Sequence, residues 1–446
     1  MKYKKIYKKT TINLPNENIM KIRAITIGQK IPYLIEDKEF ESVMEQNLSK
    51  FNAFNRDLTQ QFNDIAIEVQ TKRLCSQPIL SYDQQLHARN LNETLTRIHE
   101  QLDILERIVS KYGFDYFASC AVLADEQLLK YGIYEKLLLN EIPAFIKRKE
   151  KFFSSLHVAS TENGINLSAL RSGAKIIKKL SEPDPFKNLN FCVSSNVTPD
   201  TPFFPAAYHV SERPSFSLAL EMADEVVKAF ENSKNFKEAQ NNLRTRFNEI
   251  YDNLMRICED VANKHDIEFS GIDFSPAPYP TIEKSIGTAF EKLNFEYFGA
   301  HGSLIGVAII KNAIPKRKKV IGFSGFMPSV LEDYTISKSL SENKFNLDTL
   351  LLYATICGTG LDCVPLPGDI TERELFYILL DICTISLRLK KPLTARLMPI
   401  PGRNAGDVVD FDFEYFASSK VMDIRRLSDT NENDLFSSKQ KSFNFL

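Results

Sequence analysis

Residues 21–28 have the sequence KIRAITIG, in which β-branched residues alternate with other residue types up to a glycine. A polar–apolar pattern with helical spacing follows from Glu36 to about Asp64, and IAIEVQTKRL at 65–74 has the composition of another strand. A strand, a helix and a strand in succession predict a βαβ unit with parallel strands.

The same alternation continues along the chain. Further strands are expected at FFSSLHVAS, NFCVSSN, SFSLAL, EFSGIDFS, KVIGFSG and LTARLMPI. Helical spacing between them predicts helices at about 219–232, 236–265, 281–293, 303–313, 345–356 and 371–389. About ten strands that alternate with helices predict an α/β protein, built either as a doubly wound sheet or as a closed barrel.

Composition narrows the class of protein. The 446 residues are 43% hydrophobic and 25% charged, as is usual for soluble globular proteins. Lys and Arg (56) balance Asp and Glu (57), which argues against the large basic field of a nucleic-acid-binding protein. The apolar runs are shorter than the roughly 20 residues of a transmembrane helix, so no membrane partner is expected.

The cysteines and the N-terminus indicate a cytoplasmic protein. Seven cysteines occur without a CxxC pair, which suits reduced thiols. The basic start MKYKKIYKK is not followed by the apolar segment of a secretory signal. We expect a basic N-terminal extension at 1–19, one α/β domain at 20–425 and a polar C-terminal tail at 426–446.

Four segments at predicted strand ends concentrate Gly, Pro and polar residues, namely 194–209, 271–280, 298–303 and 360–369. Loops that follow parallel strands converge on one face of an α/β fold, so these segments are expected to build a site. The glycines and prolines of GLDCVPLPGD at 360–369 are interpreted as loop residues that hold Asp362 and Asp369 at its rim, although Asp369 or Thr371 could equally cap the next helix.

Two acid–base candidates stand out. Asp273 lies in an apolar strand, so its carboxylate needs a partner if it is buried. His301, between Gly299 and Gly302, could transfer protons near neutral pH or bind an anion, or it could be an ordinary loop histidine.

Two arginines are candidate anion ligands. Arg396 interrupts the apolar strand LTARLMPI, and Arg73 occupies a similar strand end. Each guanidinium would need a carboxylate or a phosphate partner, which leaves a substrate clamp and a structural ion pair as alternatives.

Common cofactor motifs are missing. No GxGxxG follows a strand, and the chain has no P-loop, HExxH, zinc-type cysteine pairs or GxSxG. The cofactor is therefore left unknown. A divalent ion held by Asp273 and neighbouring carboxylates stays open, because hard cations bind oxygen ligands whose spacing in sequence is not fixed.

The sequence also resembles the family called domain of unknown function 711, over about residues 20–425. The shared motifs are IRAITIG, VQTKRL, STENGINLSAL, NVTPDTPFFPAAYH, GIDFSPAPYPTIEKSIG, GAHGSLIGVAIIKNAI, ICGTGLDCVPLPGD and RLMPIPGRNAGD. The resemblance implies a ten-stranded α/β barrel like that of pyruvate formate-lyase and other glycyl-radical enzymes, with helices outside, in a homo-oligomer. The positions that match the family's polar pattern are Arg73, Asn166, Asn196, His209, Asp273, His301, Asp362, Asp369 and Arg396.

Radical chemistry is a less favoured implication of this resemblance. It needs a thiol that faces a backbone glycine near the C-terminus. Cys357 and Gly406 are the residues available, but the pattern around them departs from that of the radical enzymes.

These observations predict an enzyme that acts by acid–base chemistry on a small metabolite bearing a carboxylate or phosphate. The catalytic candidates are Asp273, His301 and Asp362, and the substrate-binding candidates are Arg73, Asn196, His209, Asp369 and Arg396. A noncatalytic ligand sensor or assembly protein is the alternative, because the same pocket would serve it.

Overall fold

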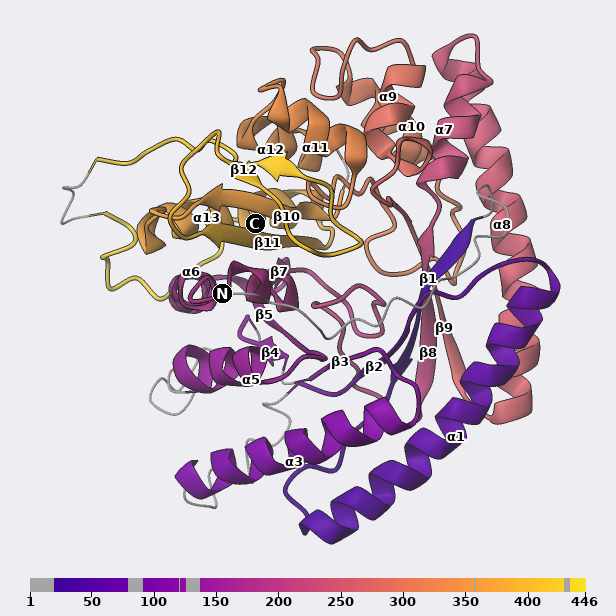
Figure 1. Cartoon of the computed structure of the whole chain (residues 1–446), viewed down its shortest axis with the longest axis vertical. Helices are drawn as coiled ribbons and strands as arrows, with labels where there is room; N and C mark the ends of the chain where they lie inside the picture. The colour runs from indigo at the N-terminus through magenta and orange to yellow at the C-terminus, as the bar shows by residue number, and fades with distance from the viewer. Residues whose placement is uncertain (1–19, 79–90, 120, 126–136, 357, 429–433) are drawn as a thin grey trace.

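The computed structural model describes residues 20–78, 91–119, 121–125, 137–356, 358–428 and 434–446. A large, mostly parallel sheet of 12 strands forms the centre of the molecule. Helices surround the strands, with α1, α3, α5, α6 and α8 on the outside (Figure 1). The α/β class predicted from the sequence is confirmed.

The main path of the sheet has the order β10-β11-β7-β5-β3-β2-β1-β8-β9. Strands β1, β2, β3, β5 and β7 form one parallel run, and β8–β9 and β10–β11 are two further parallel pairs. Antiparallel pairing joins these groups at β1–β8 and at β7–β11. The strands of the large sheet are β1 (Lys21–Gly28), β2 (Lys72–Cys75), β3 (Tyr116–Ala118), β4 (Val122–Leu123), β5 (Phe152–Ser160), β6 (Gly164–Asn166), β7 (Phe191–Ser195), β8 (Ser215–Glu221), β9 (Glu268–Ala277), β10 (Gly360–Pro367), β11 (Leu393–Ile400) and β14 (Ser442–Phe443). A separate pair comprises β12 (Val408–Val409) and β13 (Ser419–Lys420).

The helices cover the sheet with apolar faces. Apolar side chains three and four residues apart form the buried stripe of α1, which includes Phe40, Met44, Leu48, Phe51 and Phe54. Each such side chain contributes about 1.5–3 kcal/mol when it is removed from water. The helices are α1 (Asp37–Asp64), α3 (Leu91–Lys111), α5 (Ile142–Arg148), α6 (Leu167–Leu180), α7 (Ala223–Glu231), α8 (Phe236–His265), α9 (Ile286–Lys292), α10 (Leu304–Ala313), α11 (Tyr334–Ser341), α12 (Leu347–Ala354) and α13 (Glu372–Leu389).

Some element boundaries differ from those predicted. The strand expected at 65–74 begins only at Lys72, because α1 continues to Asp64 and Ala66 then turns the chain at a φ of 60°. Helix α3 is described from Leu91, since 79–90 lie outside the described residues.

The segment interpreted as a loop at 360–369 is mainly a strand, which corrects the sequence-based interpretation. Strand β10 is buried along its whole length, and its pairing within the sheet is to β11 alone. On the other side of β10 the described residues form one bridge, at Asp362, and Pro365 and Pro367 lie beyond it, where their missing N–H groups are not needed for pairing. Position 360 has no room for a side chain, since a Cβ on Gly360 would lie 2.1 Å from the carbonyl oxygen of Thr394.

The segment 319–330 lies between the two ends of the sheet path. Ile272 of β9 forms a parallel bridge with Val320, and Asp362 of β10 forms one with Ser329. The strand predicted at KVIGFSG therefore appears as an isolated bridge.

The C-terminal tail is held against the domain. Strand β14 pairs with β6, and the Arg171 guanidinium donates to the carbonyl oxygens of Leu435, Phe436 and Gln440. Across the part of the chain that is described, no helix has both the length and the apolar character of a membrane span.

Candidate functional site

Side chains from seven strands of the large sheet line one pocket. Strands β1, β2, β3, β5, β8, β9 and β11 contribute to it, together with loop residues and residues of the β12–β13 connection. Its polar and titratable lining residues are Arg23, Thr71, Arg73, Tyr116, Asp273, Ser275, Glu332, Arg396 and Tyr415. The strand order explains this convergence, because the chain returns to the same sheet from distant parts of the sequence.

Arg396 of β11 is buried in a network of two carboxylates. Its Nε donates to Asp362 Oδ1 at 2.6 Å, and its Nη2 donates to Glu332 Oε1 at 3.1 Å. Burial alone would lower the pKa of this guanidinium, but the attraction of Asp362 and Glu332 outweighs it and raises the pKa. Arg396 is therefore a fixed positive charge, held by two carboxylates that accept from its Nε and Nη2.

Arg23 of β1 is paired in the same way. Its Nη1 lies 3.2 Å from Glu221 Oε2 and its Nη2 lies 3.0 Å from Glu332 Oε2. Lys284 approaches Glu221 from the other side at 3.0 Å, and the Tyr415 ring packs 4.6 Å from the Arg23 guanidinium carbon. Glu332 thus links Arg23 and Arg396.

Arg73 of β2 differs from these two arginines. Its Nε donates to Thr71 Oγ1 at 2.9 Å, and its guanidinium lies over the rings of Phe204 and Tyr116, at 5.2 and 5.8 Å from their centres. Among the described residues, no carboxylate makes an ion pair with it. Burial, and then the positive charge of Arg23, lower the Arg73 pKa to about 10.

Asp273 of β9 is buried, and backbone amides hold its carboxylate. Oδ1 accepts from the N–H groups of Ser275 (2.9 Å) and Ser324 (3.0 Å), and Oδ2 accepts from that of Phe323 (2.9 Å). Burial raises the pKa of Asp273 despite these hydrogen bonds. This carboxyl group therefore combines a fixed orientation with an increased tendency to hold a proton.

One group of donors has the composition of a cation site. Oxygens of Glu332 and Asp362 and the thiol of Cys363 all lie within 4.8 Å of one another, and all three residues are buried. Arg396 already contacts both carboxylates, and burial raises the pKa of the Cys363 thiol well above its usual value. The two carboxylates therefore form an ion-pair network with Arg396 rather than part of an open set of cation ligands.

Three of the predicted site residues line the pocket together. They are Arg73, Asp273 and Arg396, and Asp362 contacts the pocket through Arg396. The structure does not bring the other four to it. His301 is exposed in a turn before α10, and Asp369 is exposed and ion-paired with Arg426 at 2.5 Å. The cap of α13 is Thr371.

Asn196 and His209 make local contacts elsewhere. Asn196 has a φ of 52°, accepts from the Thr161 N–H at 2.7 Å and donates to the Ser386 carbonyl at 3.1 Å, so its side chain joins the turn after β5 to α13. The His209 ring is buried, with Nδ1 2.7 Å from Asp200 Oδ1. Neither residue lines the pocket.

The sequence is similar to that of one protein family along most of its length. The family model described as "Uncharacterised ACR (DUF711)" matches residues 14–419. The chain belongs to this family. Similar curated proteins are UPF0210 proteins: one from Pyrobaculum aerophilum is 30% identical over 341 residues (73% of each chain), and one from Acetivibrio thermocellus is 26% identical over 436 residues (94% of each chain). One from Oenococcus oeni is 25% identical over 414 residues, or 90% of each chain.

The sequence-based assignment to the DUF711 family is therefore confirmed. The radical interpretation that came with it is not tested, because Cys357 lies outside the described residues. Gly406 is exposed at a φ of 88°, in the loop that follows β11.

Four titratable pocket residues of this DUF711 chain were missed from the sequence: Arg23, Tyr116, Glu332 and Tyr415. Arg23 gave a usable signal, because it interrupts the apolar strand KIRAITIG just as Arg396 interrupts LTARLMPI. Glu332 and Tyr415 lie outside the predicted strands, so only the folded chain places them.

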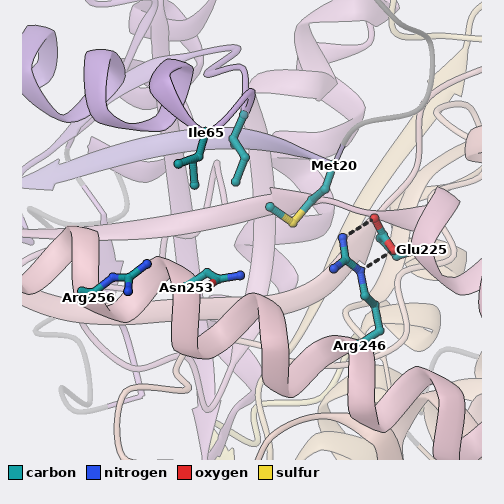
Figure 2. Close-up of a pocket in the computed structure, with 7 residues that line it drawn as sticks. Met20, Ile65, Glu225, Arg246, Asn253 and Arg256 are labelled. Atoms are coloured by element: carbon teal, nitrogen blue, oxygen red, sulfur yellow. Dashed lines mark hydrogen bonds and ion pairs between the residues drawn. The ribbon is translucent and has the colours of Figure 1, made fainter.

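A second depression lies beside α7 and α8 (Figure 2). Its Arg246 points at Glu225, with Nε–Oε2 and Nη2–Oε1 distances of 2.7 and 3.0 Å, so this arginine is already neutralised. Met20 and Ile65 form an apolar part of its wall. None of the predicted site residues lies there, and we assign the candidate site to the first pocket.

Proposed function

We propose that this pocket is the active site of an enzyme that acts on a small anionic metabolite. Arg73 binds the anion, Asp273 exchanges a proton with the ligand, and the network of Arg23, Glu332 and Arg396 fixes the shape of the site. The observation that most supports the proposal is the lack of an ion pair at Arg73 within the described part of the chain. Arg73 is the one lining arginine that has no ion-paired carboxylate among the described residues.

An incoming anion would complete the contacts of Arg73. Burial and the positive charge of Arg23 both disfavour the charged form of Arg73, which lowers its pKa to about 10. The attraction of a bound carboxylate or phosphate would offset both effects. Thr71 and the flanking rings of Tyr116 and Phe204 orient the guanidinium before the ligand arrives. Such preorganisation lowers the entropy cost of binding.

Asp273 supports catalysis beyond binding. A buried carboxyl group with a raised pKa is a common form of general acid or base. Three backbone N–H groups fix its position, so proton transfer would need no movement of the side chain. The same contacts also suit the alternative, a noncatalytic ligand-binding protein in which Asp273 only joins β9 to the 323–324 backbone.

Binding is tested with the variants Arg73→Gln and Arg213→Gln. Arg213 is an exposed arginine paired with Asp266, so its loss controls for charge alone. Acetate, benzoate and inorganic phosphate are titrated by calorimetry. A charged hydrogen bond contributes about 1.5–3 kcal/mol, so R73Q is expected to weaken anion binding by about tenfold or more, and R213Q to leave it unchanged. Equal affinities for the two variants would contradict the proposal.

Catalysis is tested separately with Asp273→Asn. Wild-type protein and D273N are incubated with a metabolite extract, and mass spectrometry follows which acids disappear. Loss of a turnover that R213Q retains supports the enzyme. Anion binding without turnover in the wild-type protein supports the noncatalytic alternative.

We also propose that residues 319–330 close the sheet into a barrel, as the family resemblance implied. Support comes from hydrogen bonds on both sides of this segment. On the β9 side, Ile272 N donates to Lys319 O at 2.7 Å and Ile321 N to Ile272 O at 3.0 Å. On the β10 side, Val330 N donates to Asp362 O at 3.0 Å. A crystal structure in which this segment leaves either strand would contradict closure.

A further inference from the structure

We infer that the ligand is a monocarboxylate with a compact apolar or aromatic body. A phosphorylated sugar or another hydroxyl-rich polyanion is the competing class. This inference rests on the proposed anion-binding function and narrows it to one chemical class. It follows from three features of the pocket: its charge balance, its apolar walls and the state of its polar groups.

The charge balance leaves a single positive charge for the ligand. Around the pocket, three cations contact three carboxylates in one connected network, comprising Arg23, Arg396 and Lys284 with Glu221, Glu332 and Asp362. Arg73 is left over. Asp273 is the remaining acid, and backbone amides rather than cations hold it. One carboxylate would neutralise Arg73, whereas the second charge of a phosphate would have no counter-charge there.

The walls of the pocket are mainly apolar. Ten of its nineteen lining residues have apolar side chains, and two more are tyrosines. Phe153 belongs to β5, Phe203 and Phe204 lie in the loop after β7, and Phe413 faces the pocket from the β12–β13 connection. Such walls stabilise an apolar ligand body by removing its surface from water. Ligand hydroxyl groups would lose their hydrogen bonds to water against them.

Three polar lining residues, Thr71, Ser275 and Glu332, already have partners inside the protein. Thr71 Oγ1 donates to the Arg23 carbonyl and accepts from Arg73, and Ser275 Oγ accepts from the Gly325 N–H at 3.2 Å. Glu332 is shared between Arg23 and Arg396. A ligand with several hydroxyl groups would have to break these contacts, whereas one carboxylate at Arg73 would break none of them.

The test compares matched probes by calorimetry. Phenylacetate is the apolar monocarboxylate, 2-phenylethanol has a similar shape without the charge, benzylphosphonate carries a dianion on an aromatic body, and 3-phosphoglycerate is the polar polyanion. Three variants accompany the wild-type protein: R73Q, the control R213Q and Phe413→Ala. Phe413 is half-buried on a connection, so its truncation leaves the sheet unchanged.

Phenylacetate is expected to bind at least about tenfold more tightly than each other probe. R73Q should remove this preference over 2-phenylethanol, and F413A should weaken phenylacetate severalfold without affecting inorganic phosphate. If 3-phosphoglycerate or benzylphosphonate binds more tightly, and R73Q abolishes that binding, the ligand class inferred here is wrong although the anion site stands. If no probe depends on Arg73, both proposals fall.

Discussion

Replacing Asp362 by Asn would show how far burial controls the ion pairs of this protein. Asp362 is fully buried and lies 2.6 Å from Arg396, so the change leaves a buried guanidinium with one carboxylate instead of two. Removal of one partner from a buried pair costs about 3–5 kcal/mol, and the remaining contact with Glu332 at 3.1 Å places the expected loss near 3 kcal/mol.

The matched control lies seven residues along the chain. Asp369 also pairs with an arginine, at 2.5 Å from Arg426, but its side chain is 65% exposed against 0% for Asp362. Its replacement by Asn should cost at most about 1 kcal/mol, because exposed pairs contribute little. Urea unfolding of both variants measures the free energy of unfolding. Losses for D362N and D369N that agree within error would refute the argument from burial.

Two further changes test buried groups outside the ion-pair network. Burial raises the Asp333 pKa from 3.8 to about 6, so the folded state favours the protonated acid. The free energy of unfolding should therefore fall by about 3 kcal/mol as the pH rises from 4 to above 6. Urea titrations of Asp333→Asn should show a free energy of unfolding that depends less on pH. Gly322→Ala should destabilise more than Gly402→Ala in the same assay: both positions have positive φ, but only at Gly322 would a Cβ approach Asp273 Oδ2, at 2.3 Å. An unchanged pH profile for D333N, or equal losses for the two alanine variants, would contradict these assignments.

The sequence predicted the architecture better than it predicted the site. Periodicity located α8 and α13 well, because each is long and strongly patterned. It failed at β10, where glycines and prolines that usually mark loops occur in a buried strand. There the close approach of a neighbouring backbone overrides the local preference of the residues.

For the site, the useful signal was a charged residue inside an apolar strand. Asp273 and Arg396, which carry this signal, both line the pocket. The signal of a polar residue flanked by glycines failed at His301, because such turns also occur on the surface. Glu332 and Tyr415 lie beyond any strand pattern, so their contribution depends on how distant segments meet.

The lining of the pocket extends along the sequence from Arg23 to Tyr415, and this breadth ties occupancy to the integrity of the whole domain. A fragment that lacks either end of this span would lose residues of the proposed binding site. If the proposed site binds a ligand, saturation raises the free energy of unfolding by RT ln(1 + [L]/Kd) and with it the melting temperature. Thermal melting against a library of acids therefore tests the proposed ligand class directly.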